Sequence, residues 1–391
     1  MAARALAVLA LARGAVGGCV DAASCFFGGA CVAGVCACRA EWAGPTCSQL
    51  NLAPATGTGV AYPPPSLPAT SSWGGSVAAA GGAFFMAVAE MEARCGLDSW
   101  ESNSAIRLAR AASPEGPFAH AALLLPHFAH NPTLHATANG SLVIAHIGQG
   151  VPIKPFISNC TNGTTPRSAA PAAAAPAAAP PLRLGVPNAP LPPPNFLYLA
   201  SGDPADGSAW AVLNSTSAWA ENNPALLVSA DDSALLVYKV HCDCPGGCFC
   251  AQFGVATAPH WAGPYTDRGL IDVFGEDAYI WRDPAGAPGG GFHMLFQGGN
   301  YAPVYPVYTG HWHTAASADG LNWTVDAAAV VFNGTVARTR GGPLELYRRE
   351  RHQVLFVNGA PAFLYNGAMA AGDVGDATFT AVQPVRRGAR A

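Results

Sequence analysis

From Trp73 to the end of the chain, short hydrophobic runs of strand length alternate with turns rich in Gly, Pro, Asn and Asp. No helical periodicity lasts for more than about ten residues, so the pattern predicts an all-β domain. The runs also repeat as a unit, in which a polar pair precedes a strand, a turn and further strands. We count five such units, at about residues 73–120, 130–212, 222–268, 275–326 and 340–388.

The polar pair recurs where units begin. Three units open on it: His130-Asn131, Asn222-Asn223 and Glu276-Asp277. Because units repeated around an axis close without exposed edges, the sequence predicts a five-bladed β-propeller over residues 73–391. A β-sandwich would also contain many short strands, but it gives no reason for the pair to recur. The second unit carries an Ala- and Pro-rich insertion at about 151–194, which we expect to be a disordered surface loop.

The N-terminal part has a different composition. Arg4 precedes the apolar run 5–11 and several small residues, a pattern that predicts a signal peptide over residues 1–18. That run is too short to cross a bilayer, which needs about 20 residues, and we expect no transmembrane segment. Residues 49–72 are rich in Pro, Ala, Thr and Ser and predict an extended linker before the propeller.

Charge and sequons narrow the class of protein. Only 11% of the residues are charged and the net charge is −4, which gives no electrostatic footprint for nucleic acid. The Asn-x-Ser/Thr sequons fit a secreted or extracellular glycoprotein. They stand at Asn139, Asn159, Asn162, Asn214, Asn322 and Asn333.

Residues 19–48 are dense in cysteine, which is typical of small extracellular modules held together by disulfides. The cysteines stand at Cys19, Cys25, Cys31, Cys36, Cys38 and Cys47, with Trp42 and Gly44 before the last. This spacing resembles the EGF-like family. The resemblance implies the pairs Cys19–Cys31, Cys25–Cys36 and Cys38–Cys47, and an extracellular protein contact through the module. A zinc knuckle is the alternative, but no histidine lies in the segment.

The other six cysteines leave their pairing open. Four crowd into nine residues, at Cys242, Cys244, Cys248 and Cys250. In a secreted chain they predict two local disulfides, although with His241 they could also bind zinc. Cys95 and Cys160 could pair with each other. We expect no metal and no cofactor.

In a propeller the first strand of each blade lines the axis, so the polar pairs are expected to meet in one pocket. The plainer interpretation is that Asn and Asp cap the turns before these strands. Carboxylates from different blades around one pocket suit glycoside hydrolysis by acid and base catalysis. The catalytic candidates are Glu276, Asp277, Asp283, Glu350 and Glu90. The substrate-binding candidates are His130, Asn131, Asn223, Arg282, Arg349 and Trp73.

Several segments together resemble glycoside hydrolase family 43: residues 90–104, HNP at 130–132, GEDAYIWRD at 275–283 and RRERHQVLF at 348–356. The resemblance implies a five-bladed propeller that hydrolyses arabinosides, xylosides or galactosides with inversion, using an Asp base, a second Asp and a Glu acid. Asn131 and Asn223 stand where that family usually has aspartate, and an amide cannot act as a general base. Either the candidates above form a changed catalytic set, or the protein is a non-catalytic carbohydrate-binding or cell-surface adhesion protein.

Overall fold

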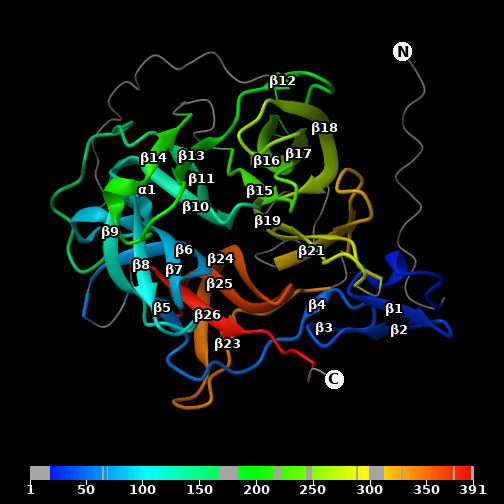
Figure 1. The fold of residues 1–391 in the computed structure, drawn as a ribbon. Helices are drawn as coiled ribbons and strands as arrows, with labels where there is room; N and C mark the ends of the chain where they lie inside the picture. Colours follow the sequence, from blue (N-terminus) through cyan, green and yellow to red (C-terminus); the bar gives the residue numbers. More distant parts are fainter. Residues whose placement is uncertain are drawn as a thin grey trace.

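Antiparallel β-sheets make up the body of the molecule (Figure 1). The structure is a computed structural model that describes residues 18–63, 66–67, 69–166, 184–214, 222–243, 249–287, 289–298, 312–326, 329–372 and 375–388. Five of its sheets follow one another along the chain, as the repeating units predict. The predicted all-β fold is therefore confirmed.

Each of the five sheets is built mainly from consecutive strands. The first contains β6 (Ser71–Ala80), β7 (Ala83–Met91), β8 (Ser104–Ala111) and β9 (Ala119–Leu125). The second contains β10 (Ala129–Ala136), β11 (Leu142–Gly148), β13 (Asn195–Leu199) and β14 (Ala211–Leu213). The third contains β15 (Ala225–Val228), β16 (Ala234–Asp243), β17 (Phe249–Ala258) and β18 (Tyr265–Phe274), with β12 (Pro190–Leu191) at its edge.

The last two sheets follow the same plan. The fourth contains β19 (Glu276–Arg282), β20 (Phe292–Gln297), β21 (Trp312–Ser317) and β22 (Thr324–Val325). The fifth contains β23 (Thr335–Val336), β24 (Leu344–Val357), β25 (Ala360–Ala370), β26 (Phe379–Pro384) and β5 (Val60–Tyr62).

The innermost strands form a closed ring. β6 contacts β10, β10 contacts β15, β15 contacts β19, β19 contacts β24, and β24 contacts β6. β5, which precedes the first blade, pairs with β26 of the last blade and so closes the circle of sheets. This arrangement is the predicted five-bladed β-propeller. In the part of the chain that the structure describes, no helix is long and apolar enough to span a membrane.

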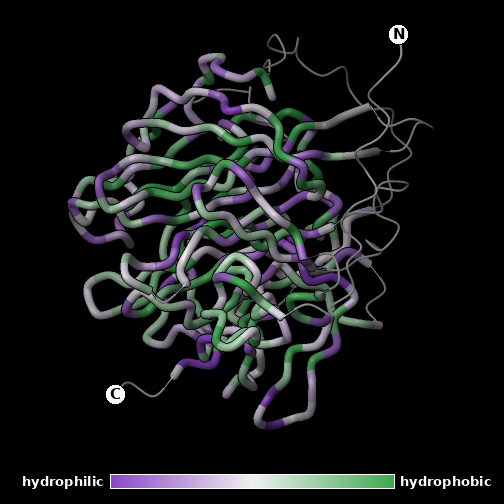
Figure 2. Tube along the Cα trace, turned by 90° about the vertical axis from the view of Figure 1, so that its right-hand side faces the viewer, coloured by the Kyte–Doolittle hydropathy of each residue, from purple (hydrophilic) through white to green (hydrophobic). Residues whose placement is uncertain are grey.

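The hydrophobic core lies between neighbouring blades. Phe85 and Ile106 of the first blade, for example, belong to one buried cluster with Leu134 and Ile144 of the second. Figure 2 shows hydrophobic stretches running through the body of the molecule, while outlying loops carry many hydrophilic residues. Each blade therefore buries both of its faces, which leaves the axis as the place where polar groups meet.

Two segments differ from expectation. Residues 49–72 do not form a simple linker, because β4 (Gln49–Leu50) pairs with β3 (Trp42–Ala43) and β5 joins the last blade. Backbone pairing with β5 covers the strand edge that β26 would otherwise expose. The described parts of the insertion also make defined contacts: Cys160 is bonded to Cys95, and β12 pairs with β18. Residues 167–183 lie outside the described residues, as do the side chains of the cysteine cluster at 242–250.

The N-terminal module consists of the short hairpin of β1 (Gly29–Val32) and β2 (Val35–Cys38), together with β3 and β4. Its disulfides are Cys19–Cys31, Cys25–Cys36 and Cys38–Cys47, the same pairs that the EGF-like resemblance implies. In Figure 1 the module (dark blue) lies beside the fourth blade. Trp42 is 2% exposed and stacks on His293 and Trp281, with ring centroids 4.8 and 6.0 Å away. The module therefore shares a core with the propeller.

Replacing Trp42 with alanine is expected to lower the free energy of unfolding by about 3 kcal/mol, because the substitution leaves a cavity in this shared core. Urea unfolding followed by circular dichroism measures the loss. Val20→Ala is the matched control, since Val20 belongs to the same module but is 85% exposed. A module that is merely tethered to the propeller would lose no more stability through Trp42→Ala than through Val20→Ala.

Candidate functional site

A residue with a positive φ recurs once per blade in or next to the innermost strand, within four residues of its start in the first four blades and in the middle of β24 in the fifth. The five residues share a positive φ: Gly74 (61°), Asn131 (53°), Asn223 (41°), Asp277 (56°) and Arg351 (50°). In β6, β10, β19 and β24 this position coincides with a shift in strand register. Such bulges redirect a side chain out of the strand's regular alternation. Asn and Asp tolerate the left-handed region better than most residues, which explains their presence at three of these positions.

Four of these residues form a hydrogen-bonded group, here called the axial network: Asn131, Asn223, Asp277 and Arg351. Asn131 Nδ2 donates to Asn223 Oδ1 (2.8 Å), and Asn223 Nδ2 donates to Asp277 Oδ1 (3.1 Å). Arg351 donates from Nη1 to Asp277 Oδ1 (3.4 Å) and from Nη2 to the carbonyl oxygen of Asn131 (2.8 Å). All four are at most 7% exposed. Side chains from four different blades therefore meet at the axis.

Gly74, the fifth residue with this conformation, makes room for the network. A Cβ atom at Gly74 would lie 2.2 Å from Cγ of Arg351. A larger residue at position 74 would collide with the Arg351 side chain. Glycine therefore leaves room beside β6 for this side chain, which reaches Asp277.

A cavity of about 440 Å³ is bounded by part of the axial network. Its size falls in the range of small-molecule sites, about 300–1,000 Å³. The lining residues come from all five blades and the loops between their strands: Trp73, Leu97, Asp98, Trp100, His130, Asn131, Asn223, Lys239, Glu276, Asp277, Arg348 and Glu350. The polar pairs of three units thus contribute to one cavity, as their recurrence predicts.

Two carboxyl groups in this cavity have different partners. Glu350 forms a bidentate pair with Arg348, in which Nε and Nη2 donate to the two carboxylate oxygens over 2.8 and 2.7 Å. Glu276 receives one longer hydrogen bond, of 3.3 Å, from Nζ of Lys239. Two parallel charge-assisted hydrogen bonds hold a carboxylate firmly in place. The Glu350 side chain is therefore held in place with its negative charge balanced by Arg348, whereas the Glu276 side chain is less constrained.

The pKa of Glu276 lies above its ordinary value. Burial is the largest cause, followed by the nearby negative charge of Asp277; Lys239 opposes the rise and Glu350 adds to it. A carboxyl group in such surroundings keeps its proton at a higher pH than usual. Glu276 therefore has the property required of a proton donor.

Aromatic rings form part of the cavity wall. The guanidinium carbon of Arg348 lies 4.9 Å from the ring centroid of Trp73, and Trp100 packs 5.3 Å from the ring of His130. His130 also pairs with the hydroxyl of Ser104 through Nδ1 (2.6 Å). Burial, with a smaller contribution from Arg351, lowers the pKa of His130 to about 3. His130 is therefore uncharged at neutral pH.

Asp283 lies outside the cavity, at the far end of β19 from Glu276. Asp283 is seven residues further along the chain, which at about 3.3 Å per residue is roughly 23 Å. Asp283 accepts hydrogen bonds from Arg39 of the N-terminal module and from His293, each over 2.8 Å. Burial acts to raise the pKa of Asp283, but His293 and Arg39 outweigh it, so the pKa lies below its ordinary value. These contacts attach the module to the fourth blade.

Three further candidates also lie away from the lining. Glu90, in the second strand of its blade, pairs with Arg107 (2.7 Å) and the hydroxyl of Tyr62. Arg282 is exposed, with its guanidinium 5.0 Å from the ring centroid of Phe292. Arg349 is 1% exposed and bonds to Asn366 and Gln383. Since side chains alternate along β24, Arg349 points away from the face that carries Arg348 and Glu350.

Other cavity residues received no role from the sequence. These are Leu97, Asp98, Lys239 and Arg348, with Arg351 in the axial network. Trp73-Gly74 and Glu350-Arg351 stand at the same place in their units as the three polar pairs. Only the shared positive φ, which the sequence does not show, links Arg351 to the three pairs. Lys239 lies in β16, the second strand of its blade, where no repeated signal marks it.

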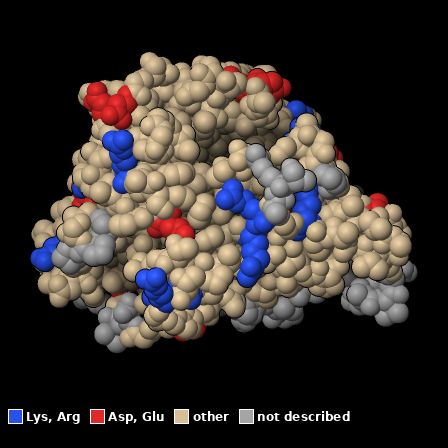
Figure 3. Space-filling view, turned by 60° about the horizontal axis from the view of Figure 1, so that its bottom comes forward, with Lys and Arg blue, Asp and Glu red and all other residues tan. Residues whose placement is uncertain are grey.

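Charged side chains are sparse on the face of the molecule that Figure 3 shows. Figure 3 shows one face on which small groups of basic and acidic side chains stand on a mostly uncharged surface. The cavity, in contrast, brings together Asp98, Glu276, Asp277 and Glu350 with two basic residues. Charged residues therefore make up a larger fraction of the cavity lining than the 11% that they make up in the whole chain.

Solved structures similar to this chain include glycoside hydrolases. The catalytic domain of an α-L-arabinofuranosidase of family GH62 from Coprinopsis cinerea has a TM-score of 0.52 at 8% identity, covering 86% of this chain and 97% of that one. A GH62 hydrolase in complex with xylotriose has a TM-score of 0.50 at 10% identity, covering 87% and 98%. No family model and no curated protein sequence matches the chain. At these identities the likeness concerns the fold, which is a five-bladed β-propeller of the kind found in glycoside hydrolases.

Proposed function

We propose that this chain is a secreted glycoside hydrolase that cleaves arabinosidic, xylosidic or galactosidic bonds in its axial cavity. One observation carries the proposal: two carboxyl groups, Glu276 and Glu350, face one cavity in different electrostatic surroundings. Burial and a neighbouring negative charge raise the pKa of Glu276, whereas Glu350 is paired with the positive charge of Arg348. Pairs of acids whose surroundings differ in this way divide the roles of acid and base. The glycoside hydrolases that share the fold support the proposal.

Each carboxyl group receives a role. Glu276 donates a proton to the leaving oxygen, because its raised pKa lets it keep that proton to a higher pH than an ordinary glutamate. Glu350, held by Arg348, activates a water molecule as the general base. Asp277 is held by Asn223 and Arg351, and its negative charge raises the pKa of Glu276. Trp100, at the wall of the cavity, offers an aromatic face on which a sugar ring can stack.

A non-catalytic carbohydrate-binding or cell-surface adhesion protein is the second candidate. Amides rather than carboxylates stand at Asn131 and Asn223, and they hydrogen-bond to each other over 2.8 Å. Such groups can bind sugar hydroxyls but cannot transfer protons. In this alternative the N-terminal module, which we propose to be EGF-like, acts as a contact for another extracellular protein.

A screen of 4-nitrophenyl α-L-arabinofuranoside, β-D-xyloside and β-D-galactoside separates the two candidates. The wild-type protein is expected to hydrolyse at least one, and Glu350→Gln is expected to lose about 10²–10⁴-fold in kcat, the usual contribution of a general base. Sugar binding without hydrolysis by the wild-type protein would favour the adhesion protein. Equal rates for the two proteins would remove Glu350 from the mechanism.

The pH dependence of hydrolysis tests the electrostatic roles. Activity requires protonated Glu276, so kcat/KM is expected to fall as the pH rises through the raised pKa of this group. Asp277→Asn removes a charge that raises this pKa, and the basic limb should move to lower pH. Lys239→Met removes a charge that lowers it, and the limb should move to higher pH. Shifts in the same direction for both variants would contradict the assignment of Glu276 as the acid.

A further inference from the structure

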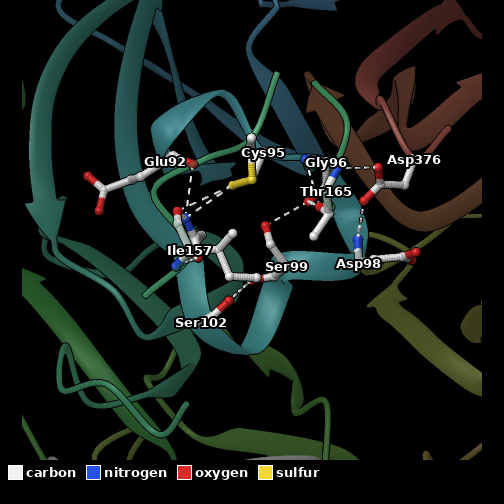
Figure 4. The surroundings of a disulfide bond; sticks show 11 residues. Glu92, Cys95, Gly96, Asp98, Ser99, Ser102, Ile157, Thr165 and Asp376 are labelled. Atoms are coloured by element: carbon white, nitrogen blue, oxygen red, sulfur yellow. Dashed lines mark hydrogen bonds between the residues drawn. A yellow bond between two sulfur atoms is a disulfide. The ribbon is translucent and has the colours of Figure 1, made fainter. Parts of the chain in front are cut away.

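Three loops from different blades meet at one wall of the cavity and are here called the rim loops: residues 92–103, 149–166 and 375–378. The first connects β7 to β8, the second follows β11, and the third precedes β26. Only the first contributes lining residues, namely Leu97, Asp98 and Trp100. Figure 4 shows side chains of all three loops converging around the Cys95–Cys160 disulfide.

Asp376 joins the three loops through its carboxylate. One oxygen accepts the backbone N–H of Asp98 and the other accepts that of Thr165, each over 2.8 Å (Figure 4). The backbone carbonyl of Asp376 also accepts the N–H of Leu97 over 2.8 Å. Asp376 is 6% exposed. A buried carboxylate that accepts two backbone amides is tightly placed, because each bond is charge-assisted.

Gly96 permits this close approach. A Cβ atom there would lie 2.2 Å from the carboxylate carbon of Asp376. The N–H of Gly96 also donates to the hydroxyl of Thr165 over 3.1 Å. The first loop therefore lies directly against Asp376 immediately before Leu97 and Asp98.

On the other side of the first loop, a second set of ties holds it to the insertion. Cys95 is bonded to Cys160, and the buried amide of Asn103 both donates to and accepts from the backbone of Ile157, over 2.7 and 3.1 Å. The lining residues of the first loop are thus held by Asp376 on one side. On the other side they are held by the Cys95–Cys160 disulfide and by Asn103. None of these anchoring residues lines the cavity itself.

We infer that Asp376 is a positioning residue that sets the affinity of the cavity for its ligand by holding Leu97, Asp98 and Trp100 in place. The inference rests on the proposed function for the identity of the ligand, a glycoside. Because Asp376 touches neither Glu276 nor Glu350 in any described contact, it acts on binding rather than on proton transfer.

The test compares Asp376→Asn with the wild-type protein on the 4-nitrophenyl glycoside that is hydrolysed fastest. An amide accepts through only one of its two polar atoms, so KM is expected to rise about tenfold, the change from losing one charge-assisted hydrogen bond. The value of kcat is expected to stay within about twofold. Asp319→Asn is the matched control, since Asp319 also accepts two backbone amides, of Leu321 and Asn322, but only within its own turn.

A second measurement does not depend on hydrolysis. In protein labelled with 5-fluorotryptophan, the ¹⁹F resonance of Trp100, assigned with Trp100→Phe, is expected to shift and broaden in Asp376→Asn. Gly96→Ala keeps the carboxylate but pushes it away, and should have the same effect if Asp376→Asn fails to fold. Asp319→Asn should leave the resonance unchanged.

Each outcome decides a different point. An unchanged Trp100 resonance in both Asp376→Asn and Gly96→Ala would overturn the inference, whether or not the protein hydrolyses a glycoside. A loss confined to kcat would overturn it as well. A wild-type protein without hydrolytic activity would contradict the proposed function, while a changed Trp100 resonance would still support the positioning role of Asp376.

Discussion

Replacing Glu276 with glutamine is expected to lower kcat for alkyl glycosides by about 10²–10⁴-fold, the usual contribution of a positioned general acid. Glutamine keeps the size of the side chain but cannot transfer a proton to the leaving oxygen. For a 2,4-dinitrophenyl glycoside the loss should be much smaller, because that leaving group needs no proton. Steady-state kinetics on the two substrates measures the difference.

Glu345→Gln provides the matched control for this experiment. Glu345 is exposed, lies at the N-terminal end of β24 and accepts one side-chain hydrogen bond, from the hydroxyl of Thr335 (2.7 Å). Its replacement should leave both rates unchanged. If Glu276→Gln lowered the two rates by the same factor, Glu276 would not be the acid.

Replacing Arg351 with methionine is expected to lower the free energy of unfolding by about 3–5 kcal/mol, the usual cost of removing one partner from a buried ion pair. Arg351 is 1% exposed, and its loss removes the donor to the carbonyl of Asn131 and leaves the Asp277 carboxylate with the uncharged amide of Asn223 in place of a cationic partner. Urea unfolding measures the effect. The double variant with Asp277→Asn should recover part of the loss, because the unpaired charge is then removed as well.

Arg268→Met is the control for charge removal alone. Arg268 is exposed and donates one hydrogen bond, to the hydroxyl of Thr257. Its replacement should change stability by no more than about 0.5 kcal/mol. An Arg351 variant as stable as this control would show that the axial network does not hold the blades together.

The hydrophobic runs predicted the all-β class, and the recurring polar pairs favoured a propeller over a β-sandwich. His130-Asn131, Asn222-Asn223 and Glu276-Asp277 mark the beginnings of innermost strands, where the second residue of each pair takes a left-handed conformation that Asn and Asp accept. Gly74 and Arg351 take the same conformation with other side chains. A search for Asn or Asp therefore finds three of the five positions. It misses Gly74 and Arg351, which lie against each other.

The candidate site was harder to predict, because distance along the chain does not show at which end of a strand a residue lies. Asp283 follows Glu276 closely in sequence, yet β19 carries it to the N-terminal module. Arg349 is adjacent to Glu350 but belongs to the opposite face of β24. The rim loops depend on contacts between residues far apart in the chain, such as Asp376 with Asp98, for which the sequence contains no local signal.

A crystal structure of the Glu276→Gln variant with xylotriose tests the central claim, that the innermost strands of the five blades form one glycan site. The account predicts a sugar in the axial cavity, within hydrogen-bond distance of residue 276 and Glu350 and beside Trp100. Xylotriose bound elsewhere on the molecule, with the axial cavity empty, would contradict it.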